Sequence, residues 1–445
     1  MTNHLKRKPH PLKASTRAKK PKPNVPKSHI APSLREESGE VIWPAPQFQM
    51  QAARSFIREC AQSSKRTLIV PDKDADGLTS GVILHRTLVL LGLSPDLISA
   101  HLLQKGNTIH SELEREAMAA HSPSYVFVLD QGSRKGPPLI SLPHKGLIID
   151  HHFAEAGGFP EGAEVVSACD SPPVATSSLL TYTLCTPLHP DVASQCGWLC
   201  AMGTHGDLGN TLKWEPPFPD MKDMFKKYTK KAINDAVSLI NAPRRTAAYD
   251  VMSAWDALLA ALDPASLLTD KRLLAARVEV NAEVERCTHT APKFSIDGKI
   301  AVFRMKSQAQ VHPVIATRWA GHLNSSKLEI ILVANEGYLP GLVNFSCRIA
   351  RYARARDPPV NIIESLKAIV AAAPDETLKQ RLGEGFARGH KEASGGTVGV
   401  NEFEELMSIL RVGEKPEKEE GGAGKKKKNG VQQKNTLMNY FGKEE

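Results

Sequence analysis

"LIVPDKDADGLTSGVI", residues 68–83, places three carboxylates at alternate positions directly after a short apolar run. Asp72, Asp74 and Asp76, followed by a glycine, match the start of a calcium-binding EF-hand loop. The twelfth position of such a loop should be a bidentate Glu, but here it is Ile83. The run before the aspartates is also β-branched and lacks the helical periodicity of an entering helix. The stretch therefore predicts a buried strand that ends at the aspartates and a helix that follows, with calcium binding as the weaker interpretation.

The surrounding sequence alternates between predicted strands and helices. "FQMQAARSFIRECAQ" is predicted to be helical before the stretch, and the next helix is predicted to follow it with Ser80 as its cap. Further strands are expected near residues 96–103, in "YVFVLD" and in "GLIID", with a helix near 112–120. This alternation predicts an α/β fold with a mostly parallel sheet covered on both faces. Ligands of such sheets gather at the carboxyl ends of the strands, where we expect the chemical residues to lie.

The length of 445 residues is sufficient for two or three domains. Strand signals return late in the chain, in "KIAVFRM", "KLEIILVAN" and "GLVNFSCRI". We expect five parts: a disordered basic tail at 1–41, a parallel-sheet domain at 42–222, a helical connector at 223–294, a second, smaller α/β domain at 295–412 and a flexible tail at 413–445.

The bulk composition is that of an ordinary globular protein, with 41% hydrophobic and 24% charged residues. No apolar stretch reaches the roughly 18–20 residues that cross a bilayer. The seven cysteines lack the paired spacing of a zinc site, so we expect buried free thiols in a reducing compartment.

The net charge of +9 is concentrated at the ends of the chain. Residues 1–30 contain nine Lys or Arg and no acidic residue, a composition that predicts disorder. Such a segment serves nuclear import or loose attraction to phosphate backbones, and a solubilising tail is the alternative. A mitochondrial presequence would be rich in Arg and Ser, whereas Lys and Pro dominate here. We therefore expect a nuclear location in preference to a mitochondrial or cytoplasmic one.

Three further segments place acidic or histidine residues after apolar runs that we interpret as strands. "YVFVLDQGS" supplies Asp130, "GLIIDHH" supplies Asp150, His151 and His152, and "WLCAMGTHGDLG" supplies Asp207. Each alone has an ordinary explanation, such as a helix cap or simple packing. Together they predict a cation site, because clustered carboxylates without a cation would destabilise the domain. Oxygen ligands with one or two imidazoles favour Mn²⁺ or Mg²⁺, and two such ions about 3.5–4 Å apart catalyse phosphoryl displacement.

"DKDADG", "VLDQG", "IIDHH" and "GTHGD" resemble, in order and spacing, the four motifs of the DHH phosphoesterase superfamily. The first motif looks most like the RecJ branch of single-strand exonucleases, because it has the third aspartate and lacks an upstream histidine. The superfamily's usual second domain has a glycine-rich signature, which "FARGHKEASGG" resembles. The resemblance covers roughly residues 42–411, apart from the helical connector.

This resemblance implies roles for individual residues. Two manganese ions would be held, with Asp130 as the bridge, by Asp72, Asp74, Asp130, His151 and Asp207. Asp76 and Asp150 would orient ligands or water, and His152 would donate to charge that develops on the scissile phosphate. The substrate's phosphate or terminal nucleotide would be held in the second domain by Arg348, Gly389, His390, Gly395 and Gly396. Arg388 stands where the signature usually has Gly, so it would add a phosphate contact, narrow the groove or point into solvent.

The C-terminal peptide "KNTLMNYF", residues 434–441, would place Leu437, Tyr440 and Phe441 on one face of a helical turn. It resembles the peptide that binds the DNA sliding clamp, although that motif opens with Gln and this slot holds Lys434. Clamp binding and an apolar terminus without a partner both stay open.

Three functions are compatible with these patterns. The first is a manganese-dependent phosphodiesterase, an exonuclease on single-stranded nucleic acid in DNA replication or repair. The second is a hydrolase of small phosphates such as short oligonucleotides, pyrophosphate or polyphosphate. The third is a non-catalytic scaffold of a replication complex, which the loss of metal-binding aspartates would mark. Because every expected ligand is present, we expect an enzyme.

Overall fold

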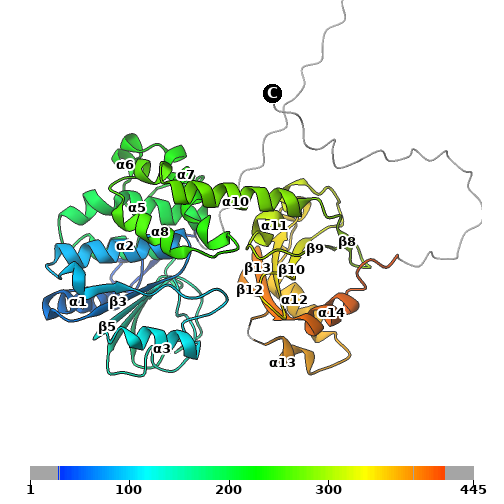
Figure 1. Ribbon diagram of the computed structural model, residues 1–445, viewed down its shortest axis with the longest axis horizontal. Helices are drawn as coiled ribbons and strands as arrows, with labels where there is room; N and C mark the ends of the chain where they lie inside the picture. The colour runs from blue at the N-terminus through cyan, green and yellow to red at the C-terminus, as the bar shows by residue number, and fades with distance from the viewer. Residues whose placement is uncertain (1–28, 30, 384, 416–445) are drawn as a thin grey trace, which may run out of the picture.

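The chain folds into two lobes, each built on its own β-sheet (Figure 1). The computed structural model describes residues 29, 31–383 and 385–415. The first lobe contains a five-stranded parallel sheet and the second a six-stranded mixed sheet. The expected α/β fold with a second α/β part is therefore confirmed. The basic segment 1–28 and the C-terminal residues Leu437, Tyr440 and Phe441 lie outside the described residues.

The first sheet has the strand order β4-β3-β5-β6-β7, and all its neighbours are parallel. Its strands are β3 (Thr67–Pro71), β4 (Ile98–Ala100), β5 (Tyr125–Leu129), β6 (Lys145–Asp150) and β7 (Ala163–Ser167), with a 3₁₀ turn, η2 (Pro95–Leu97), before β4. Side chains of successive residues point to opposite faces of a strand. Ile69 and Phe127 accordingly belong to one hydrophobic core, and Leu68 and Val126 to another. Both faces of this sheet are thus buried, as the alternation of strands and helices predicted.

Different helices cover the two faces of the first sheet. One face packs against α1 (Gln47–Ser63), α2 (Ala75–Leu90), α4 (Ser177–Cys185) and α5 (Asp191–Leu208), and the other against α3 (Glu112–Ala120). The predicted cap of α2 at Ser80 is wrong, because Asp74 caps this helix instead. The Asp74 carboxylate accepts hydrogen bonds from the backbone amides of Asp76 at 3.0 Å and Gly77 at 3.3 Å. An aspartate at this position satisfies amides that the first helical turn leaves unpaired.

Most of the helices expected as a connector pack on the first lobe. They are α6 (Lys222–Lys227), α7 (Lys230–Ile240), α8 (Val251–Ala260) and α9 (Pro264–Leu268), with the 3₁₀ turn η3 (Pro243–Arg245) after α7. Leu239 and Trp255 belong to the same core as the first sheet. The long helix α10 (Lys271–Thr288) then runs from the first lobe to the second (Figure 1), with Leu273 in the first core and Val284 in a core of the second.

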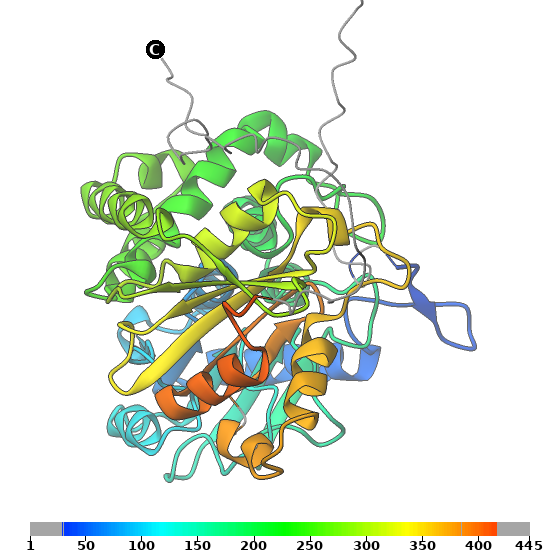
Figure 2. The same ribbon diagram turned by 90° about the vertical axis from the view of Figure 1, so that its right-hand side faces the viewer.

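The second sheet has the order β12-β13-β11-β10-β9-β8, and of its pairs only β9 and β10 are parallel. Its strands are β8 (Lys293–Phe294), β9 (Ile300–Met305), β10 (Ile330–Asn335), β11 (Leu342–Ile349), β12 (Arg388–His390) and β13 (Ala393–Gly399). One face packs on α10 and α11 (His312–His322), and the other on α12 (Ile362–Ala371), α13 (Leu378–Leu382) and α14 (Val400–Ile409), with the 3₁₀ turn η4 (Arg351–Ala353) after β11. Figure 2 shows this sheet and its helices in front of the first lobe.

Part of the segment expected to be a disordered tail has regular structure. β1 (Leu34–Arg35) pairs antiparallel with β2 (Val41–Ile42), and this hairpin projects from the body of the protein (Figure 2). The seven cysteines are free and six of them are buried, as expected. Within the described part of the chain, no helix has the length and apolar character needed to span a membrane.

Candidate metal centre

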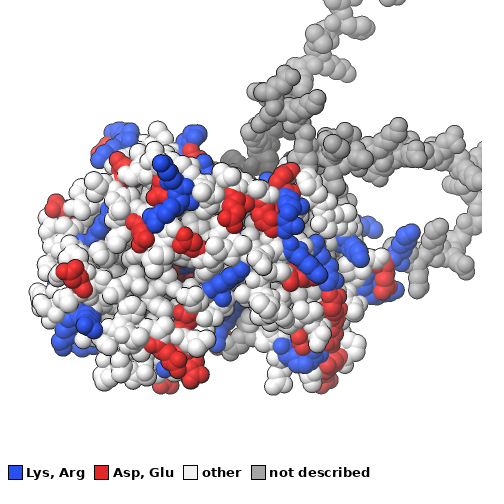
Figure 3. Space-filling view, viewed as in Figure 1, with Lys and Arg blue, Asp and Glu red and all other residues white. Residues whose placement is uncertain are grey.

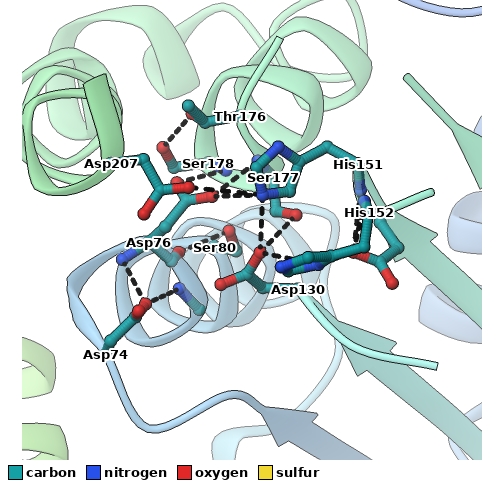
Figure 4. Close-up of polar contacts among 12 residues, drawn as sticks. Asp74, Asp76, Ser80, Asp130, His151, His152, Thr176, Ser177, Ser178 and Asp207 are labelled. Atoms are coloured by element: carbon teal, nitrogen blue, oxygen red, sulfur yellow. Dashed lines mark hydrogen bonds and ion pairs between the residues drawn. The ribbon is translucent and has the colours of Figure 1, made fainter. Parts of the chain in front are cut away.

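The acidic and histidine side chains of the four motifs meet at one edge of the first sheet. Asp72 follows β3, Asp130 follows β5 and His151 follows β6. Because β3, β5 and β6 are parallel neighbours, their carboxyl ends lie side by side. Figure 4 shows the side chains gathered there: Asp74, Asp76, Asp130, His151, His152 and Asp207.

Asp207 reaches this cluster from a helix and not from a strand. It lies in the last turn of α5, which contains the whole apolar segment that precedes it. The predicted strand is therefore wrong at this position. Residues 198–202 are all buried, and an apolar run without periodicity does not distinguish a buried strand from a buried helix.

His151 lies at the centre of the cluster. Its Nε2 atom is 3.2 Å from Asp130 Oδ1, 3.3 Å from Asp207 Oδ2 and 3.9 Å from Asp76 Oδ2. This nitrogen is buried, yet within the described part of the chain it has no partner at hydrogen-bonding angles. A buried imidazole nitrogen beside three carboxylate oxygens suits a divalent cation, since oxygen and imidazole ligands bind Mn²⁺ and similar metals. The residues present therefore fit a metal centre.

Three overlapping groups of described side chains have the spacing of a metal site. In each group, the candidate ligand atoms lie within 4.8 Å of one another. The groups are Asp72, Asp74 and Asp130; Asp76, His151 and Asp207; and Asp130, His151 and His152. Asp130 and His151 each belong to two groups, so two neighbouring cations could share them. Asp76, which was expected to stay off the metal, also belongs to one group.

The carboxylates repel one another because they lie close together, with Asp76 and Asp130 buried. Burial and the charges of Asp207 and Asp72 raise the pKa of Asp74, and burial with the charge of Asp207 raises the pKa of Asp76 to about 6. Burial and the charge of Asp76 raise the pKa of Asp130 well above its usual range. Burial lowers the pKa of His151, but the neighbouring Asp130 and Asp207 raise it well above its ordinary value. The cluster thus favours any added positive charge, as a divalent cation would supply.

Two backbone positions around the aspartates have conformations or contacts that most side chains would not allow. Asp130 has a φ of 63°, in the left-handed region that few residues other than glycine adopt. Such conformations occur preferentially at functional sites. A Cβ atom at Gly77 would lie 2.6 Å from the carbonyl oxygen of Asp72, so glycine is needed where α2 begins against the aspartates.

The start of α4 supplies contacts that the sequence analysis missed. The carboxylate of Asp76 accepts hydrogen bonds from the backbone amides of Ser177 at 2.7 Å and Ser178 at 3.0 Å. The Ser177 hydroxyl donates to Asp130 Oδ1 at 2.9 Å. "ATSS" at residues 175–178 carries a helix-capping signal, but a local pattern gives no indication of aspartates 47 and 101 residues away.

Asp150 and His152 form a pair beside the cluster. Asp150 accepts hydrogen bonds from His152 Nδ1 at 2.8 Å, Ser133 Oγ at 2.6 Å and the His151 backbone amide at 2.7 Å. Burial opposes ionisation of Asp150, but the hydrogen bonds from His152 and Ser133 hold its pKa well below the ordinary value. Burial also lowers the pKa of His152, yet Asp150 raises it overall. The His152 side chain is 46% exposed, so the ring nitrogen that Asp150 does not occupy is available to a ligand.

The predicted substrate-binding residues of the second lobe lie on three adjacent strands. Arg348 lies in β11, Gly395 and Gly396 lie in β13, and Arg388, Gly389 and His390 lie in β12; β13 pairs with both other strands. A Cβ atom at Gly395 would lie 2.5 Å from the Phe345 carbonyl oxygen, and one at Gly389 would lie 2.7 Å from that of Ala393. These glycines therefore have a packing reason that needs no ligand. The side chain of Arg388 is exposed.

Two adjacent arginines of η3 were missed because they lie in the segment expected to be a connector. Arg244 Nη2 is 3.9 Å from Asp74 Oδ2. Burial lowers the pKa of Arg245 to about 9; the charges of Arg244 and Arg348 add to this effect, and Asp74 opposes it. The signal in the sequence was "NAPRR", two consecutive arginines directly after a helix. Arg245 thus lies within electrostatic range of both the first-lobe aspartates and the second-lobe Arg348.

The second lobe contributes an arginine and a histidine, Arg348 and His312, that have no carboxylate partner among the described residues. Arg348 Nη1 donates to Ser346 Oγ at 2.9 Å and to the Cys347 carbonyl at 2.8 Å, and burial lowers the Arg348 pKa. His312 is also buried, and its Nδ1 atom has no hydrogen-bond partner among the described residues. Burial and the charges of Arg348 and Arg245 lower its pKa to about 3. The junction between the lobes therefore places Arg348, which has no carboxylate partner among the described residues, near the arginines of η3 and the acidic cluster.

The described residues on the face drawn in Figure 3 show no comparable segregation of charge. On the face seen in Figure 3, Lys and Arg are interspersed with Asp and Glu over both lobes. Attraction of a polyanion on this face therefore depends on local groups and not on a broad basic surface.

No protein-family model and no curated protein sequence matches this chain. Solved structures do match. RecJ with Mn²⁺ from Thermus thermophilus has a TM-score of 0.58 and 18% identity, covering 83% of this chain and 55% of RecJ. An exonuclease RecJ bound to manganese has a TM-score of 0.53 and 19% identity, covering 81% of this chain and 93% of that one. The DHH domain of a member of a ribosomal-protein family has a TM-score of 0.59 and 14% identity, covering 82% of this chain and 90% of that one.

This chain spans about half the length of the Thermus RecJ. At identities of 14–19%, the likeness shows the fold. The chain has the same fold as these RecJ and DHH-domain structures, which is the fold that its four motifs predicted.

Proposed function

We propose that this chain is a manganese-dependent phosphodiesterase that degrades single-stranded nucleic acid from one end. The observation that carries the proposal is the convergence of Asp76, Asp130 and Asp207 around the buried Nε2 of His151. The RecJ structures with the same fold contain manganese, and a further Thermus RecJ structure contains magnesium. A phosphodiester is negatively charged. It would therefore be attracted both by divalent cations bound in the acidic centre and by the arginines beside it.

Two divalent cations would be held by the clustered carboxylates and His151. Asp72, Asp74 and Asp130 would hold one, and Asp130, His151 and Asp207 would hold the other. Divalent cations at this position would stabilise the negative charge that develops on a phosphodiester during hydrolysis. The mixture of carboxylates with one imidazole favours Mn²⁺, with Mg²⁺ as a substitute.

His152 would act on the phosphate directly. Asp150 fixes its ring by accepting from Nδ1, so the other nitrogen can donate to a phosphate oxygen. A donor held in place in this manner stabilises charge in the transition state without reorganisation. Asp150 would act through His152 as a positioning residue.

The arginines at the lobe junction would bind the substrate's phosphates. Arg348 is half-buried and has no carboxylate partner among the described residues, and an anion bound beside it would supply the missing counter-charge. Arg244 and Arg245 come from the first lobe and Arg348 from the second, so a phosphate bound there would contact both lobes. The binding residues and the metal ligands together favour a chain with several phosphates.

Nuclear DNA replication or repair is the proposed setting. The proposal is supported by the basic segment 1–30 and by the clamp-like peptide with Leu437, Tyr440 and Phe441. Deletion of residues 431–445 should leave hydrolysis intact and end co-purification with the sliding clamp. Retained co-purification would contradict the clamp proposal. Deletion of residues 1–30 should move a fluorescent fusion out of the nucleus, and an unchanged location would contradict nuclear import by this segment.

A substrate panel with Mn²⁺ tests the activity. We expect the purified chain to convert an end-labelled single strand into a ladder of products, with little action on duplex, and Asp130→Asn to abolish this. Asp256→Asn, at an exposed position of α8, is the matched control. Cleavage of pyrophosphate alone would indicate a small-phosphate hydrolase. Hydrolysis of no substrate would indicate a scaffold, and full activity of Asp130→Asn would refute the assigned site.

A further inference from the structure

An exposed phenylalanine directly follows the two histidines of the metal centre. Phe153 is 78% exposed, although His151 two positions before it is buried. Isolated exposed apolar residues are ordinary on protein surfaces. This one differs in its position, because two peptide units span at most about 7.6 Å between Cα atoms. The Phe153 Cα atom therefore lies within about one nucleotide's length of the His151 Cα atom.

The backbone on both sides of Phe153 is anchored. Before it, the His152 ring nitrogen Nδ1 bonds Asp150 at 2.8 Å, and the His152 amide bonds the same carboxylate at 3.2 Å. After it, the Gly158 amide donates to the Glu155 carbonyl at 2.8 Å, which closes a turn. The exposed ring thus follows a histidine that Asp150 holds in place and precedes a hydrogen-bonded turn.

We propose that Phe153 is a base-stacking residue of this site. Its ring would pack on the nucleobase of the nucleotide whose phosphate lies at His152. Every base has an apolar face that stacks on an aromatic ring, whereas pyrophosphate and polyphosphate have none. This inference rests on the proposed phosphodiesterase function and narrows its substrate to base-bearing chains.

A nucleobase is a better ligand for the exposed ring of Phe153 than the surface of a partner protein. A protein that covered Phe153 would also cover His152, whose side chain is 46% exposed and would face the scissile phosphate. A base attached to that phosphate reaches the ring without obstructing the histidine. The phosphate contacts from His152 and the arginines then fix the backbone, and the ring fixes the base.

The test compares two single-stranded oligonucleotides with the same backbone, one with bases and one with abasic nucleotides. Full-length protein with Mn²⁺ is compared with Phe153→Ala, Phe153→Trp and the control Phe48→Ala, which removes a 72% exposed phenylalanine of α1. We expect Phe153→Ala to raise KM for the base-bearing strand about 10-fold, with kcat nearly unchanged, because one stacked base is lost. Phe153→Trp should restore KM, and Phe48→Ala and the abasic strand should show no change.

Equal KM values for Phe153→Ala and the parent chain on the base-bearing strand would overturn the stacking inference. An equal loss on the abasic strand would overturn it too. Fluorescence anisotropy of the same oligonucleotides separates this inference from the proposed function. Tighter binding of the base-bearing strand that depends on Phe153, without hydrolysis, would support stacking and refute the phosphodiesterase.

Discussion

The acidic centre of the first lobe and the glycine-rich edge of the second lobe differ in what holds them together. In the centre, Asp130, Asp76 and Asp207 lie close to one another although their charges repel. At the edge, Gly389 and Gly395 are required by the close packing of β12, β13 and β11. The centre is thus a set of residues that the fold alone would not select, whereas the edge is compatible with a purely structural role.

This difference decides how firmly each region supports a function. A cluster that opposes its own stability points to a ligand, because a bound cation supplies the missing charge. A glycine that avoids a clash with a carbonyl oxygen gives no such indication. At the lobe junction, the half-buried arginines Arg245 and Arg348, and not the glycines, support the proposed anion site.

Asp130→Asn should have the largest effect, since it removes a carboxylate shared by two ligand groups. We expect kcat for single-strand hydrolysis with Mn²⁺ to fall by more than about 10³-fold, beyond the loss of one transition-state donor. The metal-free variant should unfold at a higher temperature than the parent chain, because one buried like charge is gone. Thermal unfolding and steady-state kinetics measure the two effects.

A lower kcat together with a higher unfolding temperature of the metal-free variant is the result that assigns Asp130 to the metal. Lower activity with lower metal-free stability would mean that Asp130 is a structural residue, held by Ser177 for packing. The conservative Ser177→Ala variant provides the comparison, since it removes the hydroxyl that donates to Asp130 and leaves the carboxylate in place.

Asp150→Asn should have the next largest effect. The amide can accept one hydrogen bond from His152 Nδ1, but it does not supply the charge that raises the His152 pKa. We expect kcat to fall about 10–100-fold, as for other residues that orient an active group, with Mn²⁺ affinity nearly unchanged. The kinetic profile against pH should show the His152 pKa shifted downward. A large loss of Mn²⁺ affinity in titration calorimetry would place Asp150 on the metal instead.

The first lobe was predictable from the sequence because its signals are local. Unbroken apolar runs such as Leu68–Val70 marked the strands of a doubly covered sheet, and the parallel arrangement placed Asp130 and His151 at one edge. The helix of Asp207 was mistaken for a strand because a fully buried helix has no amphipathic periodicity.

Contacts between distant segments were not predictable. Ser177 lies 47 residues from Asp130, and nothing in "ATSS" distinguishes a serine that bonds an aspartate from an ordinary helix cap. Arg245 lies on a turn between helices, and its relation to Arg348 exists only once the two lobes are placed together. Sequence patterns predict which residues end an element, whereas tertiary packing decides which ends meet.

Arg245→Ala tests the lobe junction and should raise KM for single strands about 10-fold, with a smaller change in kcat. A charge-assisted hydrogen bond to phosphate of ~1.5 kcal/mol corresponds to this factor. Arg245→Lys should recover part of the loss, because a lysine keeps the charge but not the planar fork. Arg381→Ala, on α13, is the control. Unchanged KM for Arg245→Ala would exclude Arg245 from the phosphate-binding residues.

Mn²⁺ should stabilise the fold, and more so at higher pH. Asp76 has a pKa of about 6 in the fold against about 3.9 in an unfolded chain. Between about pH 4 and pH 6 the folded state therefore binds more protons than the unfolded state, and the stability of the metal-free protein falls as pH rises. A cation binds the ionised carboxylates. Above pH 6, a bound cation therefore offsets the loss of stability that their repulsion causes in the metal-free protein.

At pH 7.5, Mn²⁺ at about 100 times its Kd should stabilise the protein by about 2.7 kcal/mol, seen as a rise of several degrees in Tm. At pH 5 the rise should be smaller, because protons compete with the cation for the same carboxylates. Asp130→Asn should lose most of the rise at both pH values, whereas Asp256→Asn should keep it. A rise of equal size at pH 5 and pH 7.5 would mean that Mn²⁺ binds elsewhere, and the buried carboxylates around His151 would then need another counter-charge.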